Sequence, residues 1–217
     1  MSGEEQTGAP LGLGDAYAVR TPADNLALYR GWAATYEQDF IAPRGYVYHE
    51  NVAALFAEHR PGPDGLVLDV GCGTGIVGEA LRALGQVRID GLDLSPEMLA
   101  KAADKNVYER LIEADLTQVL PLNDANYDGV VSAGTFTHGH VGPEALTELL
   151  RVAAAGARFA LGVNAEHYHG RGFAARFDQL AEARMIDDLT IEQVRIYNEG
   201  DAEHADDLAL VVLFAKR

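Results

Sequence analysis

Beyond residue 60, apolar residues fall into short runs that alternate with segments of helical spacing. Residues 66–70 form one such run, which has the length of a strand and leads into a glycine-rich loop. A run of this kind is typical of a strand buried on both faces of a parallel sheet. The pattern predicts further strands at 88–93, 111–115, 127–133 and 157–163, and helices at 75–84, 143–153 and 173–184. This alternation indicates an α/β fold with a parallel sheet and helices on both of its faces.

The two ends of the chain depart from this alternation. Residues 1–14 contain glycine, glutamate and proline without any periodicity, so we expect a flexible tail there. At the other end, residues 188–197 and 208–215 are two β-rich runs joined by an acidic segment, which predicts a hairpin-like pair. Ser95 followed by Pro96 marks the start of one more helix, because serine caps a helix and proline suits its first position.

Aromatic residues are concentrated before the first strand. Tyr29, Trp32 and Tyr36 are three and four residues apart, so they form one stripe along a helix, and a second helix is expected at 46–59. Such a stripe either packs as ordinary core or closes over a ligand, and its spacing suits both roles. This interpretation divides the chain into a flexible tail, a helical lid or cap, and a main domain, at residues 1–14, 15–60 and 61–217.

Charge is the aspect of composition that changes the picture. The chain has 33 acidic and 17 basic residues, a net charge of −16. Phosphate backbones and anionic lipid surfaces repel so acidic a chain, so we expect neither nucleic acid nor a membrane as its partner. The chain opens without a basic segment followed by an apolar run, and we expect a cytoplasmic protein. Its single cysteine, Cys72, allows no intramolecular disulfide.

The stretch VLDVGCGTG at residues 67–75 is the motif most informative about chemistry. Its glycines let the backbone turn sharply and approach a ligand that a side chain would block. The helix that follows offers free N–H groups to an anionic group, and ligands of open α/β sheets bind at the carboxyl ends of the strands. Dinucleotide-binding and methyl-donor-binding enzymes both use such a loop, so the loop alone leaves the cofactor open.

Three carboxylates at successive strand ends separate these two classes. Asp69 stands two residues before the first loop glycine, where it suits an ammonium group and would repel a pyrophosphate. Asp93 ends the next strand and can accept hydrogen bonds from both hydroxyls of a ribose. Asp115 ends the third, within reach of an adenine amino group. Each alone is an ordinary cap or turn residue, but together with the glycine loop they favour a methyl donor.

With these residues the sequence resembles the class I S-adenosylmethionine-dependent methyltransferases, over roughly residues 29–217. The resemblance implies a Rossmann-like, seven-stranded, mostly parallel sheet with helices on both faces and an antiparallel last strand. It implies S-adenosyl-L-methionine as methyl donor and S-adenosyl-L-homocysteine as product. Residues 29–37, YRGWAATYE, further resemble the aromatic motif of the Williams–Beuren-region methyltransferase-like group.

The resemblance also implies which residues contact the donor. The loop at 69–75 would surround the methionine moiety, and Asp93 would hold the ribose. Leu94 and Met98 would flank the adenine, while Asp115 takes its amino group. The complete implied set is Tyr29, Trp32, Tyr36, Asp69, Gly71, Cys72, Gly73, Gly75, Asp93, Leu94, Met98, Asp115, Leu116, Ser132 and Ala133.

Two His-x-His pairs follow the fourth and fifth expected strands, His138 with His140 and His167 with His169. Both pairs can lie on the rim of a pocket, where a neutral imidazole serves as a base, an acceptor-binding group or a metal ligand. No carboxylate stands at a diagnostic spacing from them, so we expect no metal. His138 is the first candidate for a catalytic base and His140 the second.

The expected function is transfer of a methyl group to an oxygen or nitrogen of a small-molecule acceptor. Two other classes of protein stay open. A donor-binding regulatory protein could keep the glycine loop without catalysis. An NAD-dependent oxidoreductase is the other, because residues 73–78 also match GxGxxG, although the chain has no Tyr-x-x-x-Lys pair for its proton transfer. The acceptor and the oligomeric state are not specified by the sequence.

Overall fold

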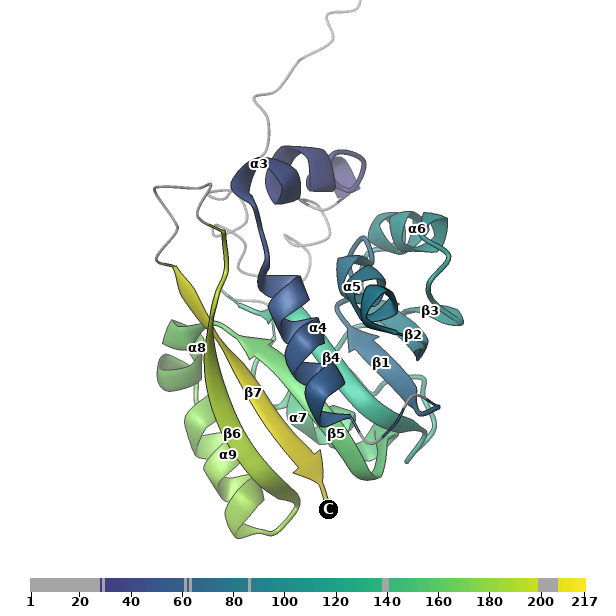
Figure 1. Cartoon of the computed structure of the whole chain (residues 1–217). Coiled ribbons are helices and arrows are strands. Elements are labelled where there is room, and N and C mark those ends of the chain that lie inside the picture. The colour runs from purple at the N-terminus through teal and green to yellow at the C-terminus, as the bar shows by residue number, and fades with distance from the viewer. Residues whose placement is uncertain are drawn as a thin grey trace, which may run out of the picture.

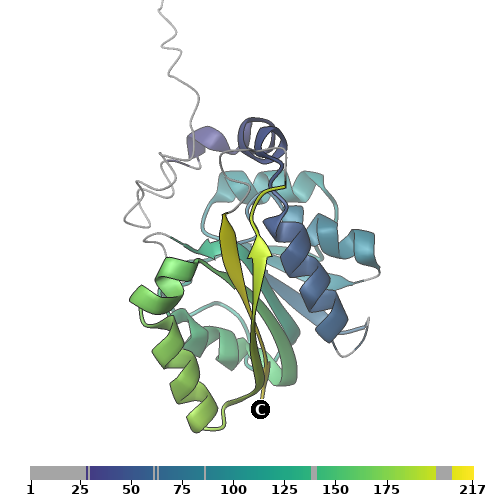
Figure 2. The same ribbon diagram turned by 60° about the vertical axis from the view of Figure 1, so that its left-hand side comes forward.

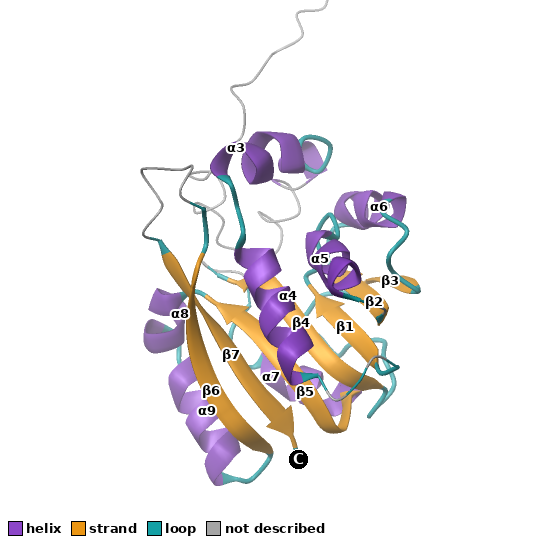
Figure 3. Cartoon of the chain, in the orientation of Figure 1, coloured by secondary structure: helices purple, strands orange, loops and turns teal. Residues whose placement is uncertain are grey.

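The computed structural model describes residues 28, 30–60, 62, 64–85, 87–137, 141–198 and 207–217. In this part of the chain the strands form one seven-stranded sheet in the order β3-β2-β1-β4-β5-β7-β6, shown in Figures 1 and 3. The strands are β1 (Leu66–Val70), β2 (Arg88–Asp93), β3 (Arg110–Glu113), β4 (Tyr127–Phe136), β5 (Ala153–Val163), β6 (Ile186–Arg195) and β7 (Leu208–Lys216).

The direction of the strands changes only near one edge of this sheet. The neighbours β3, β2, β1, β4 and β5 run parallel to one another. The last strand, β7, runs antiparallel to both β5 and β6. The expected Rossmann-like sheet with an antiparallel last strand is therefore confirmed, as is the pairing of the two β-rich runs at the end of the chain.

Helices cover both faces of the sheet, and each face has its own apolar cluster. The helices are η1 (Glu37–Ile41, a π-helix), α3 (Ala42–Arg44), α4 (Tyr48–His59), α5 (Ile76–Leu84), α6 (Pro96–Asp104), α7 (Ala145–Val152), α8 (Ala165–Gly170) and α9 (Phe173–Glu182). Buried side chains of α7, α8 and α9 join one cluster, and those of α4 and α5 join the other. Figure 2 shows α8 and α9 on one side of β6 and β7, with α4 on the other.

The helix α4 belongs to the packed core rather than to a separate lid. Val52 and Phe56 of α4 are 0% and 1% exposed, and a Cβ atom at Gly129 of β4 would overlap the Phe56 ring. Of the expected lid or cap at 15–60, the part that forms α4 is therefore packed in the core. Within the described residues, the segment before Gly45 lies beyond the carboxyl end of the sheet, where α3 is seen in Figure 1.

The spacing of the aromatic stripe predicts one continuous helix, but the described residues there form no continuous helix. Residues 33–35 form a turn in which the N–H of Thr35 donates to the carbonyl oxygen of Trp32, and the π-helix η1 follows. Pro43 explains the wide helix, because proline has no N–H and its ring crowds the carbonyl of Asp39 four residues earlier. The turn and the π-helix change the angular spacing on which the prediction of the stripe depends.

Candidate functional site

The glycine-rich loop lies at the carboxyl end of β1, where the strand order reverses between β1 and β4. Gly71, Gly73 and Gly75 have φ angles of +66°, +54° and +91°, which side chains strongly disfavour. The N–H groups of Gly71 and Cys72 donate to the carbonyl oxygen of Leu92 at 2.7 and 3.0 Å, which ties the loop to the end of β2. Gly75 then caps α5.

Two glycines of this loop are required for different reasons. A Cβ atom at Gly71 would overlap the side chain of Thr135 on β4. A Cβ atom at Gly73 would meet no atom within 4 Å, and Gly73 lines a pocket. Gly71 therefore allows two parts of the protein to pack, whereas Gly73 keeps the pocket open to a ligand.

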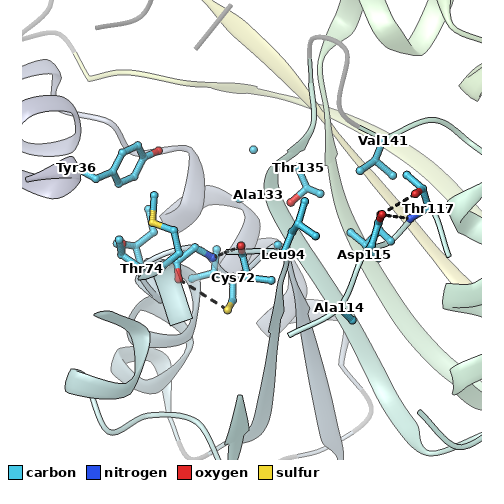
Figure 4. A pocket seen from close by; sticks show the side chains of 18 of the residues that line it. Tyr36, Cys72, Thr74, Leu94, Ala114, Asp115, Thr117, Ala133, Thr135 and Val141 are labelled. Carbon is cyan, nitrogen blue, oxygen red and sulfur yellow. Dashed lines mark hydrogen bonds between the residues drawn. The ribbon is translucent and has the colours of Figure 1, made fainter. Parts of the chain in front are cut away.

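The pocket lies over the carboxyl ends of β1, β2 and β4. Figure 4 shows Tyr36 on one side of it and Asp115, Thr117 and Val141 on the other. Its lining residues are Tyr36, Tyr46, Gly71, Cys72, Gly73, Thr74, Ile76, Val77, Asp93, Leu94, Met98, Ala114, Asp115, Leu116, Thr117, Ala133, Gly134, Thr135 and Val141. Most residues of the expected donor-binding set are thus brought together around one hollow.

Asp93 lies at the end of β2 with both carboxylate oxygens engaged by the backbone. The N–H of Gly73 donates to Oδ2 and the N–H of Ser95 donates to Oδ1, each at 2.8 Å. Burial raises the pKa of this carboxyl, and the backbone hydrogen bonds oppose the increase. Each oxygen of a carboxylate has room for about two hydrogen bonds, so both can still accept one from a vicinal diol such as ribose.

The far end of the pocket combines apolar walls with one carboxylate. Met98 and Leu116 are buried, and Leu94 lies beside them in the lining. Asp115 follows β3, and its Oδ1 accepts hydrogen bonds from the N–H and the hydroxyl of Thr117 at 2.8 and 2.7 Å. The other oxygen, Oδ2, accepts no hydrogen bond within the described residues, which leaves it available to an amino group of a flat aromatic ring.

Asp69, near the end of β1, is 0% exposed and is not among the described residues that line the pocket. The hydroxyl of Tyr108 donates to Oδ2 of Asp69 at 2.7 Å. Burial raises the pKa of Asp69 to about 7, and the hydrogen bond from Tyr108 opposes this increase.

Ser132 and Gly75 also lie outside the pocket lining. The Ser132 side chain is buried in β4 and donates to the carbonyl oxygen of Val70 at 2.7 Å, so its hydroxyl holds β4 to β1. Ala133, the next residue, faces the opposite way along the strand and lines the pocket. Gly75 turns the chain into α5 behind the loop.

The three residues of the aromatic stripe are placed differently from one another. Tyr29 lies outside the described residues. Trp32 is 1% exposed and packs edge-on against Tyr36, with ring centroids 5.2 Å apart. Tyr36 is half-buried and lines the pocket, whereas Trp32 does not. Trp32 therefore supports the ring that reaches the ligand site.

The two histidine pairs have different outcomes. His138 and His140 lie outside the described residues, between the end of β4 and Val141. His167 and His169 lie on the short helix α8, which Asn164 caps and whose Tyr168 packs into the core. Neither of these two lines the pocket, because α8 packs down against the sheet.

Tyr46 and Thr135 line the pocket but are missing from the sequence-based set. Tyr46 reaches the site through an isolated bridge to Tyr197, a contact between residues too distant in the chain for any local pattern to indicate. Its ring stacks on the buried imidazole of His49, with centroids 5.6 Å apart, and burial lowers the pKa of His49. Thr135 follows the end of the expected fourth strand, whereas β4 continues to Phe136.

Ion pairs join the segment before Gly45 to the helices beside the glycine loop. Arg30 pairs with Glu97 of α6 at 3.0 Å. Lys105, which is 13% exposed, pairs with Glu37 of η1 at 3.1 Å and also with Glu79 of α5. These contacts hold the segment that carries Tyr36 over one side of the pocket.

Within the described part of the chain, no three His, Cys, Asp or Glu residues lie together in a way that could hold a metal ion. The same residues contain no helix that is both long enough and apolar enough to cross a membrane.

Known proteins of the methyltransferase class are similar to this chain over part of their length. Residues 68–161 match a family model described as a methyltransferase domain. Methyltransferase-like protein 27 from Homo sapiens is 36% identical over 137 residues, 62% of this chain and 56% of that protein. An 18S rRNA (guanine-N(7))-methyltransferase from Bos taurus is 38% identical over 66 residues, 30% of this chain and 23% of that protein. The chain therefore spans about half or less of the length of these relatives.

A solved structure of the cyclase SpnF has the same fold over nearly the whole chain. The TM-score is 0.69 at 17% identity, covering 92% of this chain and 97% of that one. A likeness at this identity shows the fold and leaves the reaction to be argued from the site.

Proposed function

We propose that this chain methylates an oxygen or nitrogen of a small-molecule acceptor. Its methyltransferase domain has the class I fold, and the methyl donor of that family is S-adenosylmethionine. The observation that carries the proposal is the open space at Gly73, where a Cβ atom would point into the pocket. Asp93, with capacity for a diol, and the apolar walls at Leu94 and Met98 suit the remaining parts of the donor.

The bound donor supplies a methyl group already activated by its sulfonium charge, so the protein's contribution is to align and enclose the two reactants. Alignment alone can contribute about 7–11 kcal/mol to lowering the barrier. Asp93 and the loop orient the donor, and the apolar walls exclude water. Tyr36 and Tyr46 line the pocket with large aromatic rings suited to contact an acceptor.

Donor binding is tested first with Asp93→Ala. The change removes a charged acceptor of two ribose hydrogen bonds, each worth about 1.5–3 kcal/mol. We expect at least a tenfold loss of S-adenosylmethionine affinity by calorimetry, with the melting temperature measured in parallel. An unchanged affinity in a folded variant would exclude Asp93 as the ribose ligand.

The small-molecule acceptor is supported by charge. The chain has a net charge of −16, and among the residues that the structure describes none that lines the pocket is Lys or Arg. To bind an RNA acceptor, the protein needs Lys or Arg side chains that contact the RNA phosphates. To bind a carboxylate acceptor, it needs at least one such cation at the site. We therefore expect turnover with neutral or amine metabolites in a panel assay. Methylation of RNA in preference to the panel would show that the assignment is wrong.

His138 is proposed as the base that removes the proton of a hydroxyl or ammonium acceptor, with His140 as second candidate. His138→Gln is expected to lower kcat by about 10²–10⁴-fold and to leave donor affinity unchanged. His140→Gln is the matched control. If both variants keep full kcat on the identified acceptor, the acceptor needs no histidine base.

Two other functions make different predictions. A donor-binding regulatory protein would be stabilised thermally by S-adenosylhomocysteine but would turn over nothing in the panel. An NAD-dependent oxidoreductase would be stabilised by NAD instead. The proposal requires stabilisation by S-adenosylhomocysteine together with methyl transfer.

A further inference from the structure

Tyr108, which follows α6 and precedes β3, has its ring beneath the glycine-rich loop. Three glycines, one each in the loop, α5 and β2, make room for the ring: a Cβ atom at Gly75, Gly78 or Gly91 would lie 3.0, 2.6 or 3.1 Å from its atoms. A side chain at any of these positions would therefore press on the Tyr108 ring, which the glycine pattern alone does not reveal.

The hydroxyl of Tyr108 contacts Asp69, which lies near the end of β1, where the glycine-rich loop starts. It donates to Oδ2 of Asp69 at 2.7 Å, and Asp69 is 0% exposed. The other carboxylate oxygen, Oδ1, accepts no hydrogen bond within the described part of the chain. Gly71, where the loop begins, follows two residues later in the chain, so a change in the position of Asp69 bears on the start of the loop.

We infer that Tyr108 is a positioning residue for the methyl-donor site, which holds Asp69 in place beneath the glycine-rich loop. The inference rests on the donor assignment proposed above. An anion there favours a donor that carries a sulfonium and an ammonium group, without contacting either. Tyr108 acts through Asp69 and is not itself a catalytic residue.

Asp69 faces the Tyr108 hydroxyl, the Cys72 thiol and Asp93, and burial raises the pKa of Asp93 as well. Burial raises the pKa values of the Tyr108 hydroxyl and the Cys72 thiol well above their usual range, so both stay neutral. Burial raises the pKa of Asp69, and the negative charge of Asp93, across the loop, raises it further. Because the Tyr108 hydrogen bond lowers that pKa, losing the hydroxyl shifts Asp69 towards its neutral form at pH 7.

A second tyrosine–aspartate pair provides a matched control. Tyr127 donates to Oδ2 of Asp90 at 3.0 Å, and Asp90 is also 0% exposed. This pair is compensated by Arg110, which bonds the same oxygen, and neither member lines the pocket. Tyr127→Phe removes the same kind of hydrogen bond away from the donor.

The experiment measures S-adenosylmethionine affinity by calorimetry, and the melting temperature, for Tyr108→Phe and Tyr127→Phe between pH 6 and 8.5. We expect about tenfold weaker binding for Tyr108→Phe at pH 7, shrinking to within about threefold at pH 8.5, where Asp69 ionises in the variant too. In turnover assays the donor KM should rise while kcat at saturating donor stays within twofold. Tyr127→Phe should lower the melting temperature and leave donor affinity within twofold at every pH.

Gly78→Ala tests the same contact from the other side. Alanine favours a helix over glycine, yet its Cβ atom would displace the Tyr108 hydroxyl, so the affinity should fall although the helix gains. When Asp69→Asn is introduced into both the wild type and Tyr108→Phe, the two proteins should show the same pH dependence of donor affinity.

If Tyr108→Phe and Gly78→Ala both bind the donor like the wild type at pH 7 while Asp93→Ala loses binding, the donor site stands and Tyr108 is only packing. If Asp93→Ala also binds normally, the donor assignment itself is wrong and the role of Tyr108 falls with it.

Discussion

At the scale of single residues, the loop glycines illustrate how one backbone conformation serves two purposes. Gly71 and Gly73 both have positive φ, but only at Gly71 would a side chain meet the protein. We predict that Gly73→Ala lowers the melting temperature by a few degrees, from about 1–2 kcal/mol of backbone strain, and abolishes detectable donor binding. Gly71→Ala should instead destabilise the fold severely. Normal donor affinity in Gly73→Ala would show that the donor binds elsewhere.

Asp69 predicts a pH dependence whose sign follows from its raised pKa. With a pKa of about 7 in the folded protein and 3.8 as its ordinary value, the carboxyl is neutral below pH 7 and anionic above it. Affinity for the cationic donor should therefore rise about tenfold between pH 5.5 and 7.5. The contribution of this group to folding stability should fall as the pH rises from about 4 to about 7, because the folded state holds the proton longer. Asp69→Asn should flatten both profiles, and a wild-type affinity independent of pH would contradict the assignment.

The sequence indicates the parts of this site that depend on neighbours along the chain. Gly73, Asp93 and Met98 stand in or directly after the strand–loop–helix units that the apolar pattern locates, so their meeting at one edge follows from parallel strands. Tyr46 is held by its bridge to Tyr197 and Tyr108 by its hydrogen bond to Asp69, and no local pattern encodes contacts between residues so far apart in the chain. Asp69 has the expected position in the chain but faces inward, because a neighbouring tyrosine accommodates it.

At the scale of elements, the segment before Gly45 is the part that we propose to move. We predict that S-adenosylhomocysteine increases protection from hydrogen exchange across residues 30–44, since Tyr36 lines the pocket there. Residues 48–59 of α4 should be highly protected in both states, because Val52 and Phe56 are core residues, and they serve as the internal control. Equal, high protection of 30–44 with and without the ligand would identify that segment as ordinary core.

The elements differ in how closely the apolar pattern predicts them. The strand β1 and the helix α5 are found within a residue, because a buried run and glycines bound them. The strand β3 ends at Glu113, so Asp115 belongs to a turn held by Thr117 rather than to the strand. The helix α8 is too short for a periodic pattern to reveal, and its cap at Asn164 is its one local signal.

At the scale of the whole molecule, the strand order concentrates the site. The sheet reverses direction of growth between β1 and β4, and the loops after these strands diverge there to leave the pocket. The antiparallel pair β7 and β6 lies beyond β5 at one edge of the sheet, so it stabilises the core, and neither strand contributes a residue to the pocket lining that the structure describes. Variation of those strands is expected to affect melting temperature more than donor affinity.

The ion pairs over the pocket have a consequence for how long a spent donor stays bound. Salt screens such pairs over about 10 Å at 0.1 M, so the residence time of S-adenosylhomocysteine should shorten a few-fold between 0.05 and 0.5 M salt in stopped-flow measurements. Lys105→Gln should shorten it at low salt and remove most of the salt effect, because Lys105 joins Glu37 to Glu79. Lys101→Gln, an exposed change in α6 one turn before Lys105, should do neither. Where product exit limits turnover, moderate salt would therefore increase kcat while it shortens the residence time of the product.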